Sequence, residues 1–254
     1  MRDEDADLAI AQEGEVAVIE MRRGPHNYFD EPFMARLADA CEALDAEPAC
    51  RAIVLAAEGR SFCAGANFGS GERRGRPGAL YAHGLRLFRL ATPLVAAVHG
   101  PAIGGGLGLA LAADFRIACA EARFSANFNR LGFHPGFGMS VTLPRVVGVQ
   151  HAARLLYTGC RIGGDEALRI GLVDALVEPG RVRTEALAWA RDIAASAPLA
   201  VRDTRATLRA GLADAVAAAL QREADLQARH FATSDFREGV AAMAERRLPV
   251  FRGE

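Results

Sequence analysis

The stretch Ile103-Gly104-Gly105-Gly106-Leu107-Gly108 lies between an apolar run, Leu94 to Val98, and a helix-like segment, Leu109 to Ala113. Glycine lets a backbone approach a ligand closely and adopt positive φ, and the first four N–H groups of a helix have no partner within the helix. The stretch therefore predicts either a tight packing turn between a strand and a helix or a site that binds an anion.

A second turn of the same kind, Ser61-Phe62-Cys63-Ala64-Gly65-Ala66, follows the apolar run that ends at Leu55. If neighbouring strands deliver both turns to one crevice, the backbone N–H groups of Ala66 and Gly105 converge on a single oxygen. An enolate or a tetrahedral oxyanion needs such donors. Small residues on both turns would leave clearance for a ligand: Ala64, Gly65, Gly104 and Gly106.

Apolar runs predict four strands, over residues 16–19, 52–55, 94–98 and 115–119. Between the first two, residues 30–44 predict a helix that Asp30 caps and whose first turn contains Pro32. Each later strand follows a turn or a helix. The pattern therefore predicts stacked β-α units rather than hairpins, and an α/β fold.

The composition changes after about residue 181, where alanine, arginine and glutamate recur at helical spacing. We therefore predict a core over residues 1–180 and an all-helical region over residues 181–254. The helical region carries an apolar stripe at Leu208, Leu212, Val216 and Leu220, which is extensive for an appendage to bury alone. The stripe predicts that the chain forms an oligomer.

The overall composition argues against several functions. The net charge is −1 and both signs are mixed along the chain, so we expect no nucleic-acid partner. All basic residues are arginine, which excludes Schiff-base chemistry and a phosphate-loop lysine. The five cysteines show no metal-ligand spacing and predict reduced thiols. With no long apolar run and an acidic N-terminus, we expect a cytoplasmic protein without a metal or a membrane partner.

Residues 68–78 are rich in glycine, proline and polar side chains, which predicts a surface loop. Because this loop directly follows the second turn, we interpret it as a lid over whatever binds near Ala66. The alternative is a solvated connection with no role in binding.

Three motifs lie in order along the chain: Ser61 to Ala66, Val98 to Gly106, and Asp235 to Pro249. With these motifs the chain resembles the enoyl-CoA hydratase/isomerase (crotonase) superfamily from Val16 to Arg252. The resemblance implies a crotonase-like ββα spiral followed by a C-terminal all-helical trimerisation region. It also implies an acyl-CoA thioester as ligand, with CoA as part of the substrate and no permanently bound cofactor, and a homotrimer or a dimer of trimers.

The resemblance further implies which residues form the site. In the family, two backbone N–H groups polarise the thioester carbonyl, and these correspond to Ala66 and Gly105. Contacts to the substrate and its CoA portion would come from both turns and nearby segments: Asn27, Phe29, Ala64, Asn67, Phe68, Gly104, Gly108 and Phe128. Family members usually carry aspartate where this chain has Asn67, a change that removes a charge but keeps a hydrogen-bonding group.

The two acid–base residues of family hydratases are absent. The family places one glutamate in the helix after the glycine run and another after the fourth strand, and this chain has Gly108 and Phe128 there. Neither side chain transfers a proton, so hydration by two carboxylates is not available. The candidate substitutes are His134, on a turn where relatives place other catalytic side chains, and Tyr81, in the helix after the predicted lid. Their structural alternatives are a loop hydrogen bond for His134 and packing for Tyr81.

We therefore predict an acyl-CoA-processing enzyme that stabilises a thioester enolate and performs isomerisation, decarboxylation, hydrolysis or an atypical lyase step. One alternative is an ordinary enoyl-CoA hydratase with a substitute acid and base. Another is a catalytically silent acyl-CoA binder, which would keep the two turns without the proton-transfer groups.

Overall fold

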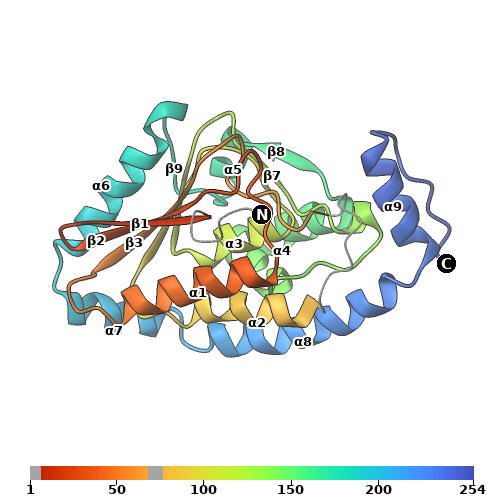
Figure 1. Cartoon of the computed structure of the whole chain (residues 1–254). Helices are drawn as coiled ribbons and strands as arrows, with labels where there is room; N and C mark the ends of the chain where they lie inside the picture. The colour runs from red at the N-terminus through yellow and green to blue at the C-terminus, as the bar shows by residue number, and fades with distance from the viewer. Residues whose placement is uncertain (1–6, 68–76) are drawn as a thin grey trace.

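A six-stranded sheet in the order β1-β2-β3-β4-β6-β9 forms the centre of the fold (Figure 1). The computed structural model describes residues 7–67 and 77–254. The strands of this sheet are β1 (Leu8–Glu13), β2 (Val16–Met21), β3 (Ala52–Ala57), β4 (Leu94–Val98), β6 (Phe115–Ala118) and β9 (Ala175–Leu176). Neighbouring strands from β2 onward run parallel, and all four predicted strands begin at the predicted residues.

One edge of the sheet differs from the predicted stack of β-α units. β1 and β2 form an antiparallel hairpin, which turns at Gly14, where φ is +63°. β1 is an exposed edge strand, and its sequence lacks the run of β-branched residues that marks the buried strands. The expectation of no hairpins is therefore wrong at this edge.

A smaller sheet of three strands, ordered β5-β7-β8, adjoins the glycine run. Its strands are β5 (Ala102–Ile103), β7 (Arg123–Ser125) and β8 (Arg161–Gly163). Strands of two or three residues are too short to show a periodic pattern in the sequence. β5 leads directly into Gly104, whose N–H donates to the carbonyl of Ser125 on β7 at 2.8 Å. This sheet therefore positions the start of the next helix.

Helices surround the main sheet. α1 (Glu31–Asp45) begins as predicted, because the side chain of Asp30 accepts a hydrogen bond from the N–H of Phe33 at 2.9 Å. The other helices of the described chain are α2 (Pro77–Phe88), α3 (Gly105–Ala112), α4 (Met139–Thr158), α5 (Gly164–Arg169), α6 (Val182–Ala194), α7 (Pro198–Leu208), α8 (Leu212–His230) and α9 (Ser234–Ala244), with 3-10 turns η2 (Asn129–Leu131) and η3 (Pro179–Arg181). α6 packs over β3, β4 and β6, while α1, α2 and α8 form a layer below the sheet in Figure 1.

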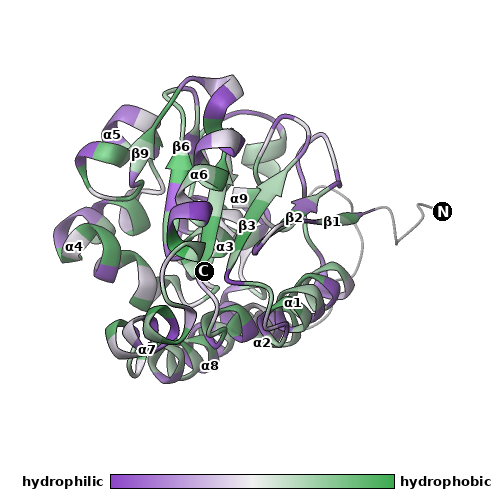
Figure 2. Cartoon of the chain, turned by 90° about the vertical axis from the view of Figure 1, so that its left-hand side faces the viewer, coloured by the Kyte–Doolittle hydropathy of each residue, from purple (hydrophilic) through white to green (hydrophobic). Residues whose placement is uncertain are grey.

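The distribution of apolar residues matches these layers. In Figure 2, β3 is apolar along its length, whereas helices such as α4 and α7 alternate between apolar and polar residues. α3 differs from these outer helices, since every residue from Gly106 to Ala112 is buried. The helix that follows the glycine run is thus a core helix held from all sides.

The apolar stripe of the C-terminal region is largely covered by the chain itself. Leu212, Val216 and Leu220 are buried on α8, which packs against α2 and α4. These three residues therefore need no partner chain, although Leu208 remains 69% exposed. The division of the chain at residues 180 and 181 stays a prediction. Within the described residues, no helix combines the length and the apolar character that crossing a membrane requires.

Candidate active site

The two glycine-containing turns lie against each other. The N–H of Ile103 donates to the carbonyl of Cys63 at 3.0 Å, and Cys63 also pairs with Ala102 as an isolated parallel bridge. A Cβ placed on Gly65 would lie 3.1 Å from the backbone nitrogen of Gly105. Both turns follow parallel neighbouring strands, β3 and β4, so they leave the sheet at the same edge.

Glycine is required where the turns touch. A Cβ on Gly106 would overlap the carbonyl oxygen of Cys63. Gly65 has a φ of +74° and Gly104, the N-cap of α3, a φ of +56°, which strain any residue that carries a Cβ. The glycine run is therefore a packing turn, and the same close approach brings backbone donors of two turns together. The sequence left open whether the glycine run is a packing turn or an anion-binding site, and this geometry is compatible with both.

The N–H groups of Ala66 and Gly105 are available to a ligand. Both residues are half-buried, and across residues 7–67 and 77–254 neither N–H donates a hydrogen bond. Gly105 begins α3, where unpaired N–H groups and the helix dipole favour negative charge. Accessible donors on two touching turns can stabilise a carbonyl oxygen that gains negative charge.

Phenylalanine side chains cover the face of α3 beside these donors. A Cβ on Gly105 would overlap the ring of Phe29, and one on Gly108 would lie 2.6 Å from the Cβ of Phe137. The centroids of the two rings are 6.0 Å apart. The position where the resemblance places a glutamate is thus filled by the side chain of Phe137.

Phe137 adopts an uncommon backbone conformation to reach this place. Its φ is +64°, which is rare for a bulky residue and marks strain that the surroundings hold. A Cβ on Gly84, on α2, would lie 2.8 Å from the ring, which is 1% exposed. Phe137 was not among the predicted site residues. The sequence Gly136-Phe137-Gly138, a large residue between two glycines, is the signal that could have revealed it.

An aromatic ring also occupies the second glutamate position. Phe128 is buried, and its ring centroid lies 5.5 Å from that of Phe133 in an edge-on contact. A Cβ placed on Gly104 would lie 3.9 Å from the same ring and 3.2 Å from the carboxamide oxygen of Asn127. Phenyl and carboxamide groups do not exchange protons near neutral pH, so neither position supplies an acid or a base.

Tyr81 is buried on α2 and hydrogen-bonded. Its hydroxyl donates to Oε1 of Gln227 on α8 at 3.0 Å, and its ring packs edge-on against Phe137 with centroids 6.1 Å apart. Burial raises the pKa of Tyr81 far above its usual range. At neutral pH this phenol therefore stays protonated, and its proton is donated to Gln227.

His134 connects its loop to α8 through its backbone. Its N–H donates to Nδ1 of His230 at 3.0 Å, and its carbonyl accepts from Nε2 of Gln227 at 2.9 Å. The ring Nδ1 lies 2.7 Å from the carbonyl oxygen of Pro135, which can only accept, so Nδ1 carries a proton. In the neutral imidazole, Nε2 then has the lone pair. The loop hydrogen bond expected as the structural role of His134 is thus formed by Nδ1. It does not involve Nε2.

Glu223 is a buried carboxylate on α8 that was absent from the predicted site. It accepts hydrogen bonds from the N–H of Gly138 at 2.8 Å, and from the N–H and hydroxyl of Ser140 at 3.1 and 2.6 Å. It therefore caps the N-terminus of α4. Burial raises the pKa of Glu223. With Gln227 and His230 it continues the apolar stripe of α8 at helical spacing, which is the signal that could have revealed it.

Asn27 uses its side chain within the protein. It is fully buried with a φ of +50°, and its Nδ2 donates to the carbonyls of Glu58 and Ser61 at 2.7 Å each. Its Oδ1 accepts from the N–H of Arg23 at 2.8 Å. The carboxamide holds the turn before Phe29, and the predicted contact between Asn27 and CoA stays a prediction.

The remaining predicted CoA contacts follow the second turn. Ala64 and Asn67 are half-buried, and the N–H of Ala64 donates to the carbonyl of His26 at 3.0 Å. Phe68 and most of the predicted lid, residues 68–76, lie outside the described residues. The roles of these residues in binding stay predictions.

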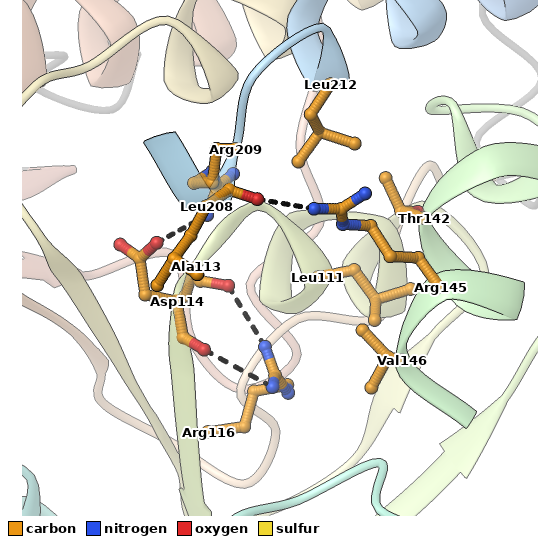
Figure 3. A pocket seen from close by; sticks show the side chains of 10 residues that line it. All are labelled: Leu111, Ala113, Asp114, Arg116, Thr142, Arg145, Val146, Leu208, Arg209 and Leu212. Carbon is orange, nitrogen blue, oxygen red and sulfur yellow. Dashed lines mark hydrogen bonds and ion pairs between the residues drawn. The ribbon is translucent and has the colours of Figure 1, made fainter. Parts of the chain in front are cut away.

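A pocket of about 230 Å³ lies at the other end of α3 (Figure 3). There Arg116 donates to the carbonyl of Ala113 at 3.0 Å, Arg145 to that of Leu208 at 2.6 Å, and Arg209 to the carboxylate of Asp114 at 2.6 Å. Arginine bonds to carbonyls near helix ends make this pocket a junction between helices. The described part of the chain contains no group of three metal-ligating side chains.

Fold and turns together define an α/β protein in which two touching turns present backbone N–H groups at one edge of the sheet. A model of the enoyl-CoA hydratase/isomerase family matches residues 11–254. The chain is 37% identical to a crotonyl-CoA hydratase of Syntrophomonas wolfei, over 96% of this chain and 97% of that protein. It is 32% identical to a short-chain-enoyl-CoA hydratase of Clostridium acetobutylicum, over 94% and 95% of the two chains.

Solved structures agree with these matches. An enoyl-CoA hydratase/isomerase from Pseudoalteromonas atlantica has a TM-score of 0.88 and 32% identity, and the match covers 97% of this chain and 100% of that one. The chain belongs to the enoyl-CoA hydratase/isomerase (crotonase) family, and it is an acyl-CoA enzyme of that family.

Proposed function

We propose that the protein holds the thioester carbonyl of an acyl-CoA between the N–H groups of Ala66 and Gly105, and catalyses a reaction other than hydration by two carboxylates. When a proton or a carboxylate leaves the α-carbon, the electron pair moves toward the carbonyl oxygen, and the two donors stabilise the enolate. The observation that carries this proposal is the ring of Phe137 beside Gly108, because an apolar side chain fills the place of the first carboxylate. Isomerisation, decarboxylation, hydrolysis and an atypical lyase step remain the candidate reactions.

We assign proton transfer to His134. It lies three residues before Phe137 on the loop that covers α3, and its Nε2 has a lone pair when the ring is neutral. Tyr81 is the second candidate, and because its raised pKa keeps the phenol protonated at neutral pH, it would act as a hydrogen-bonding group and not as a base.

Crotonyl-CoA hydration tests the exclusion of ordinary hydratase chemistry. The measurement is the loss of the enoyl-thioester absorbance, with the crotonyl-CoA hydratase of Syntrophomonas wolfei as positive control. We expect a rate below about 1% of the control, because a missing general acid or base costs about 10²- to 10⁴-fold. Efficient hydration would refute the proposal and favour the alternative that the names of the relatives suggest, a hydratase with a substitute acid and base.

A panel of enoyl-, β-ketoacyl- and malonyl-type thioesters tests for the reaction and for His134. We expect turnover of one class, reduced at least about 100-fold in His134→Ala, which removes a general base. Tyr81→Phe is the matched comparison, because it removes one hydroxyl and leaves the ring in place. If every thioester binds and none reacts, the protein is a catalytically silent acyl-CoA binder.

We also propose that the protein is a homotrimer or a dimer of trimers, as in the resemblance. Support comes from exposed leucines in the C-terminal part, Leu199 on α7 at 77% and Leu248 at 75%. Neither residue has cover within the chain, and a subunit interface would bury both.

A further inference from the structure

We propose that Phe137 closes the acyl pocket beyond the oxyanion donors and restricts the enzyme to short acyl groups. The inference rests on the acyl-CoA function proposed above and names the substrate class of the same site. It follows from four features: the face of α3, two glycines, the anchoring of the loop, and the chemistry of the wall.

The face of α3 relates Phe137 to the thioester. Gly105 and Gly108 are three residues apart and therefore lie on one face of the helix. Phe29 covers the first of them and Phe137 the second, and their rings are in contact. An acyl chain that extends beyond the α-carbon of a thioester held at the Gly105 N–H would meet these two rings.

Two glycines open the slot that Phe137 fills. Gly108 on α3 faces the Cβ of Phe137, and Gly84 on α2 faces the tip of its ring, at 2.6 and 2.8 Å from the Cβ that each glycine lacks. Glycine is unfavourable in a helix interior, so its presence on two helices around one ring indicates a packing requirement. Without the ring, the space between α2 and α3 would join the site of the thioester.

The loop holds the ring in place. Glu223 accepts the N–H of Gly138 at 2.8 Å, directly after Phe137. A Cβ on Gly136 would overlap the hydroxyl of Tyr81, so the loop is also pressed against α2 on its other side. Because both neighbours of Phe137 are anchored, the ring does not swing aside to admit a longer chain.

The chemistry of the wall completes the assignment. Phe29, Phe137 and the ring of Tyr81 form a continuous apolar surface, which favours uncharged acyl groups. A short uncharged chain ends at the rings, whereas a longer one would have to displace Phe137.

Binding of acetyl-, butyryl- and octanoyl-CoA, measured by calorimetry, tests the proposal. We expect the wild type to bind octanoyl-CoA at least about tenfold more weakly than butyryl-CoA. In Phe137→Ala the octanoyl affinity should rise at least about tenfold, because each newly buried methylene contributes about fourfold. Acetyl-CoA, which does not reach the ring, should bind all variants within about threefold. Phe137→Leu removes less volume and should show a smaller shift in the same direction, should the alanine variant fail to fold.

Phe33→Leu is the matched control. Phe33 is fully buried like Phe137, but it lies on α1, where its ring contacts Arg23 and Arg36. It should leave the preference for short chains unchanged. The proposal is overturned if the wild type binds octanoyl-CoA as tightly as butyryl-CoA, or if the Phe137 variants keep the wild-type ratio. If the wild type binds no acyl-CoA of any length, the proposed function itself fails and this proposal with it.

Discussion

Gly108 and Phe137 are complementary in size, and each explains the other. The helix residue has no side chain, and the Cβ of the loop residue lies 2.6 Å from the place that a Cβ of residue 108 would take. A carboxylate on α3 and a phenyl ring at position 137 therefore exclude each other. The residue at position 108 is thus sterically linked to a residue 29 positions further along the chain.

Gly108→Glu should destabilise the protein instead of restoring hydratase activity. Overpacking a core costs about 1–3 kcal/mol, and a buried carboxylate without a partner adds about 1–3 kcal/mol. We expect Phe137→Ala to relieve part of this loss, so that a double-mutant cycle in urea unfolding gives a favourable coupling of at least about 1 kcal/mol. Additive effects of the two substitutions would show that the side chains do not compete for this space.

At the scale of elements, α8 anchors the loop over the site from one helix face. Glu223 accepts hydrogen bonds from Gly138 and Ser140. Gln227 and His230 both bind the backbone of His134. α2 supports the loop from another side through Gly84 and Tyr81. The geometry of the loop over the site thus depends on a helix of the C-terminal part.

Gly84→Ala tests the packing of α2 on the loop. Alanine normally stabilises a helix interior by about 1 kcal/mol relative to glycine. Here we expect destabilisation by about 1–3 kcal/mol in urea unfolding, because the new Cβ would meet the ring of Phe137. Gly78→Ala on the same helix is the control, since no atom of residues 7–67 or 77–254 lies within 4 Å of its Cβ position, and it should be neutral or stabilising. Equal effects at both positions would contradict this account.

The hydrogen bond from His134 to His230 makes loop stability depend on pH. Burial, and then His134 and Arg229, lower the pKa of His230 below its ordinary 6.5. A lowered histidine pKa means that the neutral ring is favoured in the fold. Its contribution is present above pH 6.5 and is lost as the pH falls through the folded pKa.

His230→Ala should therefore cost about 0.5–1.5 kcal/mol at pH 8, the usual value of one hydrogen bond. By pH 5 the difference between wild type and variant should shrink, because protonation of Nδ1 already removes the acceptor in the wild type. Urea unfolding at both pH values measures it. A difference that stays constant with pH would argue against this role of His230.

At the scale of the whole molecule, the mass of the assembly in solution tests the proposed oligomer. Sedimentation equilibrium at micromolar concentration should give three or six times the chain mass of 27.0 kDa. The expected cause is burial of Leu199 and Leu248, so Leu199→Glu combined with Leu248→Glu should weaken the assembly. A monomeric wild type would contradict the prediction.

Much of the fold was predictable from local patterns. The four buried strands and α1 with its Asp30 cap were identified because burial on both faces and capping leave signals within a few residues. The strand β1 and the small sheet were not, since an exposed edge and strands of two or three residues leave no such signal. In the site, the motifs predict Gly105 and Ala66, whereas Phe137 and Glu223 lie outside every motif and were not predicted.

The sequence by itself determined the family, and it predicted the two donor turns and the absence of the hydratase glutamates, because each is a matter of which residue stands at a motif position. Only the tertiary structure decided what replaces those glutamates. Phe137 and Glu223 lie 29 and 115 residues from Gly108 along the chain, as their numbers show. Close packing brings Phe137 against Gly108 of α3, and Glu223 against the loop that carries Phe137. Such contacts between distant segments leave no periodic trace in the sequence.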